Sequence, residues 1–178
     1  MPPVLIALLV ALAITVAMVF ELRLSRRNER LLRARGAVEP ADDVFGLMRV
    51  VYPLGFVVIV IEGSLRDAIR LHYVFWGAGV LVAAKALKYW AIASLGPLWS
   101  FRVLVVPGQP LVHTGPYRYL RHPNYVALVG EFAGVALLLS APITGATALI
   151  AFGWLMWRRI QVEERALGLR TASGTPHA

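Results

Sequence analysis

Five apolar segments, separated by polar or proline-rich links, constrain the fold of this chain more than any other feature. They cover residues 3–20, 47–61, 74–87, 125–140 and 141–157. Apolar runs of this kind are typical of membrane helices, and they leave little sequence for a separate soluble core. The composition agrees, because 58% of the residues are hydrophobic and only 16% are charged. We therefore predict an all-α polytopic integral membrane protein with about five transmembrane helices.

The sequence indicates a single domain over residues 1–170, followed by a short polar tail at 171–178 that we predict to be disordered. The first three helices are expected at residues 3–22, 45–61 and 72–93. The last two apolar segments are each shorter than the roughly 20 residues that cross a hydrocarbon layer. Only Ser140, Ala141 and Pro142, without a charge, mark the turn between them. We predict a short helical hairpin there.

The distribution of basic residues predicts how the chain is oriented. The net charge is +8, and all of the 18 lysines and arginines except Arg66 and Arg70 lie in or beside alternate links and the C-terminal segment. By the positive-inside rule, the links after the first and third helices and the C-terminus face the cytoplasm. Because topology explains this charge, we predict no nucleic-acid partner. Arg23, Arg26, Arg27 and Arg30 share one helical face that suits anionic lipid headgroups.

Four ionisable residues fall inside or at the end of apolar segments. Lys85 and Lys88, one turn apart, are expected to extend to the membrane interface. Glu21 ends the first apolar run, where its carboxylate can reach water. Glu131 lies within the fourth helix, so it either has a functional role or forms a structural hydrogen bond with a neighbouring helix.

Polar side chains are most concentrated in residues 115–131, GPYRYLRHPNYVALVGE. His122 precedes a proline and should be extended, whereas Pro123 suits the first position of a helix. The free N–H groups at that helix start, with Arg118, Arg121 and His122 beside them, predict a site for an anionic group. The simpler interpretation is a helix start anchored by interfacial arginine and tyrosine side chains.

The segments on either side of this stretch are expected to meet it. Residues 94–124 lack helical periodicity but carry too many apolar residues for a disordered segment, so this loop should fold back over part of the protein. The last helix is expected to project into the cytoplasm beyond residue 157. This projection would bring Arg159 and Glu163, which share one helical face, close to the loop and to His122.

Several kinds of chemistry have no support in the sequence. Cysteine is absent, which excludes a disulfide framework, a thiol nucleophile and a Cys-ligated metal. The four histidines, at positions 72, 113, 122 and 177, have no carboxylate at ligand spacing. We therefore predict no metal site.

Three features are distinctive together: QPLVHTGPYRYLRHPNY, then Glu131, then RIQVEERAL. This combination, within residues 94–167, resembles the isoprenylcysteine carboxyl methyltransferase family, integral membrane enzymes that use S-adenosylmethionine. The earlier stretch ELRLSRRNERLLRARGAVE is similar to the bacterial branch that methylates alkylresorcinol or alkylpyrone lipids. The resemblance implies a methyltransferase with S-adenosylmethionine as its cofactor and a lipophilic acceptor, and the predicted topology places its site on the cytoplasmic side.

The resemblance also implies roles for individual residues. Those implied for the cofactor are Arg102, Gln109, Pro110, Leu111, Val112, Tyr117, His122, Pro123, Asn124, Tyr125 and Glu163. Arg159 would face the acceptor. The sequence departs from the family pattern in two places. Gln109 stands where eukaryotic members often have histidine, and the aromatic, basic tail of those members does not follow Leu167. The missing tail favours a lipid acceptor smaller than a prenylated protein.

The acceptor decides whether the reaction needs a base. A carboxylic acid is already ionised at neutral pH and could be held by Arg159, whereas a phenol with a pKa of about 10 would have to lose its proton to Glu131 or His122. Two other functions stay open, a phospholipid amine N-methyltransferase and a non-enzymatic membrane subunit that binds no cofactor. The oligomeric state is open as well.

Overall fold

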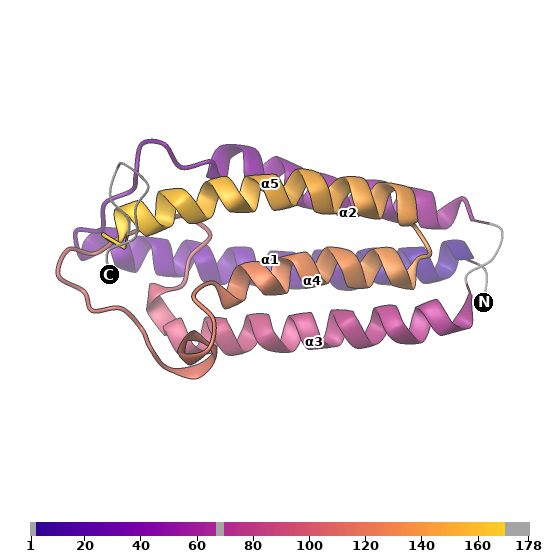
Figure 1. The fold of residues 1–178 in the computed structure, drawn as a ribbon, viewed down its shortest axis with the longest axis horizontal. Coiled ribbons are helices and arrows are strands. Elements are labelled where there is room, and N and C mark those ends of the chain that lie inside the picture. Colours follow the sequence, from indigo (N-terminus) through magenta and orange to yellow (C-terminus); the bar gives the residue numbers. More distant parts are fainter. Residues whose placement is uncertain (1–2, 67–69, 170–178) are drawn as a thin grey trace.

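The computed structural model describes residues 3–66 and 70–169, and these form a bundle of α-helices (Figure 1). The helices are α1 (Pro3–Ala34), α2 (Phe45–Ser64), α3 (Leu71–Leu95), α4 (Pro123–Leu138) and α5 (Pro142–Ala166), with short 3-10 helices η1 (Gly96–Leu98) and η2 (Gly115–Arg118). The described residues contain no β-strand, only an isolated antiparallel bridge between Val38 and Val105. The predicted all-α fold is therefore confirmed. The tail predicted at 171–178 lies outside the described residues.

Proline and glycine set several helix boundaries, as the sequence predicts. α4 begins at Pro123, directly after His122 has left the helical region with φ −129° and ψ 61°. α1 continues through the arginine-rich segment to Ala34, and Gly36 follows with a left-handed φ of 78°. Ser140, with φ 53°, makes the turn between α4 and α5. α5 is longer than its apolar segment because it continues through the charged residues to Ala166.

Three helices, α1, α2 and α3, are long and apolar enough to cross a membrane. α4 is apolar but has only 16 residues. Large apolar side chains such as Leu8, Trp76 and Ile150 are exposed on the outer faces of the bundle, which suits contact with lipid. The described residues thus support a polytopic membrane protein with three candidate spans, and membrane crossing by the α4–α5 hairpin stays a prediction.

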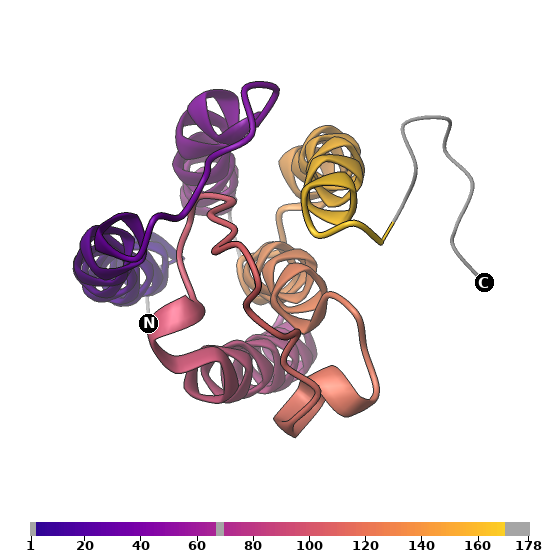
Figure 2. The ribbon, with the colours of Figure 1, turned by 90° about the vertical axis from the view of Figure 1, so that its left-hand side faces the viewer.

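An aromatic core joins α2, α4 and α5. Phe56 and Phe132 stack with ring centroids 4.5 Å apart, and Phe152 lies edge-on to Phe132 at 5.0 Å. Tyr52 contacts all three rings. In the end view of Figure 2, α4 lies between α3 and α5, while α1 and α2 complete the other side of the bundle.

Helices α3 and α4 share the most extensive contact in the bundle, and glycine makes their close approach possible. A Cβ atom on Gly134 of α4 would lie 2.7 Å from the backbone nitrogen of Leu81 and 2.9 Å from its Cα atom. A Cβ atom on Gly77 of α3 would collide with the backbone of Leu138. The two backbones therefore touch, as is typical of membrane helices that pack through small residues.

Replacing Gly134 with alanine is expected to lower the free energy of unfolding by about 1–3 kcal/mol, because the new methyl group meets fixed backbone atoms. Gly79→Ala is the matched control, since Gly79 is exposed on α3 and nothing lies within 4 Å of its added Cβ. That control should be neutral or slightly stabilising. Equal unfolding curves for the two variants, measured in detergent, would contradict the close α3–α4 packing.

Four charged side chains lie together inside the bundle, which corrects the prediction for the lysines. Lys88 is 1% exposed, and its Nζ atom lies 2.6 Å from Glu21 Oε2 and 3.1 Å from Glu131 Oε1. Lys85 Nζ is 3.1 Å from Glu21 Oε1 and 3.1 Å from Glu131 Oε1. The prediction that both lysines extend to the interface is therefore wrong, as is access of Glu21 to water, because these charges neutralise one another between helices. Glu131 also accepts a hydrogen bond from Tyr52 of α2.

Candidate functional site

The loop between η1 and α4 folds back over one end of the bundle, as predicted (Figure 2). The side-chain amide of Asn28 donates to the backbone carbonyls of Gly96 at 3.2 Å and Trp99 at 2.8 Å. The hydroxyl of Ser25 accepts a hydrogen bond from the backbone N–H of Phe101 at 2.9 Å. Ser25 and Asn28 lie on the buried face of α1, so this face holds the loop in place.

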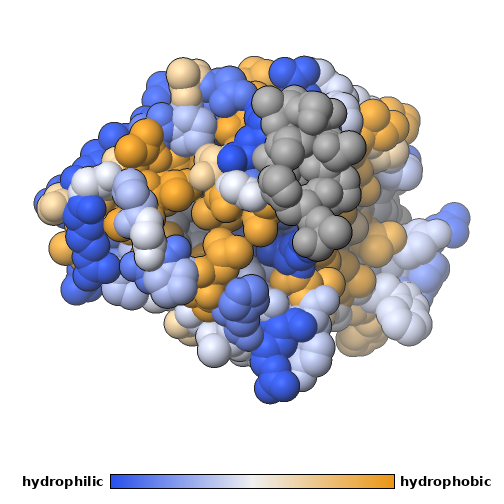
Figure 3. All heavy atoms as spheres, turned by 60° about the vertical axis from the view of Figure 1, so that its left-hand side comes forward, coloured by the Kyte–Doolittle hydropathy of each residue, from blue (hydrophilic) through white to orange (hydrophobic). Residues whose placement is uncertain are grey.

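A cavity of about 880 Å³ lies beside this loop and has two chemically different parts. Its polar part is lined by Arg102, Tyr117, Arg121, His122, Asn124, Tyr125, Arg159 and Glu163. Its apolar part lies between α1 and α2 and is lined by residues that include Ile14, Met18, Val57, Val60 and Ile61. Figure 3 shows hydrophilic side chains around patches of hydrophobic surface on the face that includes this end of the molecule. The cavity can therefore take a ligand with both polar and apolar parts.

Arg159 of α5 is the most heavily bonded side chain of the site. Its Nε donates to the hydroxyl of Tyr125 at 3.0 Å, one terminal nitrogen lies 3.3 Å from Asp43 Oδ1, and the other donates to the backbone carbonyl of Phe101. The side chains of Arg159 and Asp43 are 5% and 4% exposed. The guanidinium thus joins α5 to α4, to the loop and to the segment before α2, and its orientation is fixed without a ligand.

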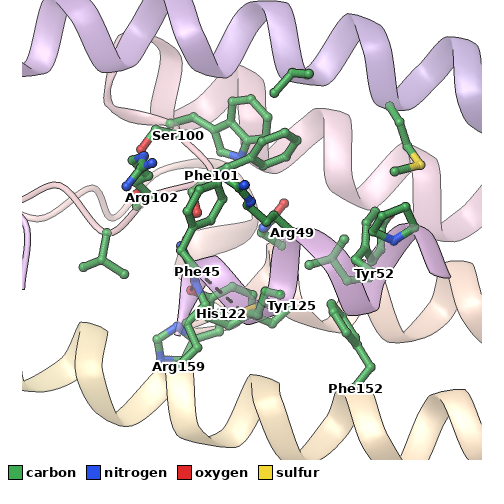
Figure 4. Close-up of a pocket in the computed structure, with 18 of the residues that line it drawn as sticks. Phe45, Arg49, Tyr52, Ser100, Phe101, Arg102, His122, Tyr125, Phe152 and Arg159 are labelled. Atoms are coloured by element: carbon green, nitrogen blue, oxygen red, sulfur yellow. Dashed lines mark hydrogen bonds between the residues drawn. The ribbon is translucent and has the colours of Figure 1, made fainter. Parts of the chain in front are cut away.

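Tyr125 connects Arg159 to a second group of titratable side chains (Figure 4). Its hydroxyl donates to Glu163 Oε2 while it accepts from Arg159. The ring of His122 stacks on that of Tyr125 with centroids 5.4 Å apart, and His122 Nε2 lies 3.2 Å from Glu164 Oε1. The expectation that α5 brings Arg159 and Glu163 to His122 is therefore met, with Tyr125 between them.

Arg102 closes the loop onto the segment that follows α1. Its guanidinium lies 2.5 Å from Glu39 Oε1 and 3.5 Å from Glu29 Oε2, and it stacks over the ring of Phe45 at 4.5 Å. Partial burial raises the pKa of Glu39, but the hydrogen bonds from Arg102 and Arg33 outweigh that effect and lower this pKa below its ordinary value. Glu39 therefore stays ionised and keeps this contact at neutral pH.

Most of the residues that the sequence implicates line this cavity, but six do not. Gln109, Pro110, Leu111 and Val112 follow a turn at Gly108 and do not line it, and the first three are exposed. Pro123 is buried at the start of α4, and Glu131 belongs to the ion cluster with Lys85 and Lys88. Neither of these two residues lines the cavity.

Tyr117, which η2 places at the cavity wall, remains a hydrogen-bond donor. Burial raises the pKa of its phenol, and the negative charge of Glu163 raises it further. The pKa lies well above the ordinary value, so the side chain is neutral at physiological pH. It offers the cavity an aromatic face and an O–H group.

Sequence reasoning missed Asp43, which organises the site from outside the motif region. Besides its ion pair with Arg159, it accepts from the backbone N–H groups of Phe45 at 3.1 Å and Val103 at 3.3 Å. An aspartate that accepts from the backbone N–H two residues later forms an Asx turn, which is a recognisable local signal before a helix start. Nothing in that local signal indicates a partner on α5.

Two buried polar atoms beside the cavity have no hydrogen-bond partner among the described residues. They are Asn124 Oδ1 and Trp99 Nε1, and both residues line the cavity. Buried polar groups are normally satisfied, so these atoms are candidates for contact with a bound molecule.

The model of the isoprenylcysteine carboxyl methyltransferase (ICMT) family matches residues 77–168, which contain the helix start at Pro123, the Tyr125 bridge and Arg159. The chain belongs to this family. It is also similar to the uncharacterized protein YpbQ of Bacillus subtilis (strain 168), with 32% identity over 147 residues, 83% of this chain and 88% of that protein. An uncharacterized protein of Haemophilus influenzae is 24% identical over 149 residues, 83% of this chain and 87% of its own length. No solved structure matches the chain.

Membership of the ICMT family, together with the long apolar helices, identifies a multi-pass membrane protein of a methyltransferase family. The match begins within α3, so α1 and α2 lie outside it. These two helices nevertheless form the apolar part of the cavity. The cavity is therefore lined partly by residues within the family match and partly by α1 and α2, which lie before it.

Proposed function

We propose that the protein is an S-adenosylmethionine-dependent methyltransferase that transfers a methyl group to an oxygen of a lipophilic acceptor in the membrane. The observation that carries this proposal is the composition of the cavity. The family residues His122, Tyr125, Arg159 and Glu163 line its polar part, and the apolar walls of α1 and α2 adjoin them. A polar cofactor and a lipid acceptor can therefore meet in one space.

The residues of the polar part fit the cofactor by their chemistry. The backbone N–H of Asn124 at the start of α4 and the side chain of His122 suit its carboxylate, and Glu163 suits its positive charge. Tyr117 offers an aromatic surface for the adenine ring, and the unpartnered oxygen of Asn124 can accept from an N–H or O–H group. We also propose that this site faces the cytoplasm, in agreement with the positive-inside pattern of the sequence.

The bound cofactor would supply an activated methyl group, and the protein would align the acceptor oxygen and exclude water. Arg159 is held by Tyr125, Asp43 and Phe101, so it presents a rigid positive charge to the acceptor. A carboxylate acceptor needs no base. For a phenol or enol, His122 is the candidate that lines the cavity, whereas Glu131 does not line it and accepts a hydrogen bond from Tyr52, which does.

The lining charges favour an oxygen acceptor over an amine. Five arginines and two glutamates line the cavity, namely Arg26, Arg49, Arg102, Arg121, Arg159, Glu29 and Glu163. This excess of positive charge disfavours the cationic headgroup of a phospholipid amine. Isoprenylcysteine and alkylresorcinol or alkylpyrone lipids are all compatible with an apolar wall.

Titration of the detergent-purified protein with S-adenosylhomocysteine tests the cofactor site. We expect a dissociation constant of about micromolar for the wild type, weakened at least about tenfold in His122→Ala and in Glu163→Ala by loss of a charge-assisted contact. His113→Ala is the matched control, because His113 is exposed and does not line the cavity. If a folded wild type binds no S-adenosylhomocysteine, the non-enzymatic scaffold replaces this proposal.

A further inference from the structure

The lipid-facing surface of the bundle has a polar limit at the end where α2 meets α5. The carboxylate of Glu62 on α2 accepts hydrogen bonds from the backbone N–H of Thr144 at 2.7 Å and from its hydroxyl at 2.6 Å, and it pairs with Arg66. These contacts cap the start of α5 and fix the polar limits of the two helices at one level. In Figure 1 the end of α2, the start of α3 and the turn between α4 and α5 lie at the same end of the bundle.

Exposed arginines set the opposite limit on the same two helices. Arg49 of α2 and Arg158 of α5 are both exposed. The sequence carries no charged residue between Arg49 and Glu62, or between Thr144 and Arg158. At 1.5 Å per residue, each of these uncharged stretches rises only about 20 Å.

Helices α3 and α4 give a similar length by other signals. α3 exposes tryptophan near both ends, Trp76 at 71% and Trp90 at 50%, and tryptophan is typical of membrane interfaces. These two residues are about 21 Å apart along the helix. The lysines of α3 do not interrupt this surface, because they pair with Glu21 and Glu131. α4 has 16 residues in all, which rise about 24 Å.

Helix α1 is the exception among the five. Its first exposed charge is Arg23, and the stretch from Pro3 to that residue rises about 30 Å. A helix with a longer apolar stretch fits a thin hydrocarbon layer by tilting. The short helices have no such freedom, because tilting reduces the thickness that they span still further. They therefore decide which layer the protein fits.

We propose that the protein fits a hydrocarbon layer of about 20–24 Å, so that it prefers membranes of short-chain lipids and thins an ordinary bilayer around itself. An ordinary hydrocarbon core, about 30 Å thick, would place Arg158 or the Glu62–Arg66 pair among lipid chains, which is costly. In the thinner layer, α4 and the apolar part of α5 are long enough to cross. This inference concerns the bilayer as a partner and does not depend on methyl transfer.

Three phosphatidylcholines with chains of increasing length test this proposal, because they share one headgroup and are all monounsaturated. They are the dimyristoleoyl, dioleoyl and dierucoyl lipids, each used to form nanodiscs around the wild type. We expect the unfolding temperature to be highest in the dimyristoleoyl lipid and at least about 5 °C lower in the dierucoyl lipid. A maximum in either of the longer lipids, or equal temperatures in all three, would overturn the proposal.

Arg158→Leu tests one of the limits directly. Removing this charge extends the uncharged surface of α5, so the difference in unfolding temperature between the shortest and longest lipids should become smaller. Arg35→Leu is the matched control, because Arg35 is exposed beyond the end of α1 and should leave that difference unchanged. If Arg158→Leu also leaves it unchanged, the assignment of Arg158 as a limit of the layer is wrong.

Spin labels measure the position of the layer independently of stability, and the absence of native cysteine makes single labelling sites simple to introduce. Ile143→Cys, Ile150→Cys and Trp157→Cys replace exposed residues of α5, with the outer two about 10 Å along the helix from the central one. In dioleoyl discs, we expect the central label to be accessible to oxygen only, and both outer labels to be accessible to a water-soluble nickel chelate. Exclusion of the chelate from either outer label would show that the bilayer is not thinned, and would overturn the proposal.

Discussion

We expect Arg159→Met to reduce methyl transfer at least about a hundredfold and to lower the free energy of unfolding by about 3–5 kcal/mol. The stability effect comes from Asp43, whose side chain is 4% exposed and has its ion pair with Arg159. Without the guanidinium, that carboxylate is buried with no cation. The loss of activity comes from removal of the positive charge proposed to face the acceptor, and from release of Tyr125 and of the loop at Phe101, which Arg159 holds in place.

Unfolding in detergent mixtures of graded composition would measure the effect on stability. Transfer of a radiolabelled methyl group from S-adenosylmethionine to a lipid acceptor would measure the effect on activity. Arg158→Met is the matched control, because Arg158 is the exposed neighbour on α5 and stacks on Trp154 instead. A double-mutant cycle with Asp43→Asn separates the ion pair from other consequences. The double variant should be more stable than the sum of the single effects indicates, because neither charge is then left alone. Simple additivity would contradict the coupling of Asp43 to Arg159.

The second large effect is expected for Lys88→Met, again about 3–5 kcal/mol in the free energy of unfolding. Lys88 is 1% exposed and lies within 3.1 Å of carboxylates from α1 and α4. Its removal leaves Glu21 and Glu131 to share Lys85 inside an apolar bundle. An excess negative charge there is costly, because no water solvates it.

A second substitution tests whether charge balance is the cause. Adding Glu131→Gln to Lys88→Met leaves Lys85 paired with Glu21, so this double variant should recover part of the lost stability. Lys85→Met should cost less than Lys88→Met, because the side chain of Lys85 is 19% exposed and less buried. If the double variant is as unstable as Lys88→Met, packing of the lysine stem rather than its charge holds the helices together.

Much of the helical framework could be predicted because the signals for it are local. Apolar segments mark the helices, Pro123 sets the start of α4, and Ser140 with Pro142 marks the turn before α5. The arginine-rich continuation of α1 could be predicted from its periodicity as well. The same periodicity does not distinguish Arg26, which lines the cavity, from Arg27, which does not.

The candidate site could be predicted only in part, because some residues of the motif region line the cavity and others do not. His122, Tyr125, Arg159 and Glu163 carry a recognisable motif, and the structure brings them together. Gln109 belongs to the same motif region but lies in an exposed turn outside the cavity wall. Proximity in sequence does not decide which side of a loop faces inward.

The sequence by itself determined that the chain is helical, apolar and multi-pass, because hydropathy and the backbone restriction of proline act within a few residues. Only the tertiary structure decided which charges are partners. Asp43 and Arg159 are 116 positions apart, and Lys88 meets two carboxylates from other helices. Such pairs depend on how each helix is rotated about its axis, and packing of whole helices sets that rotation.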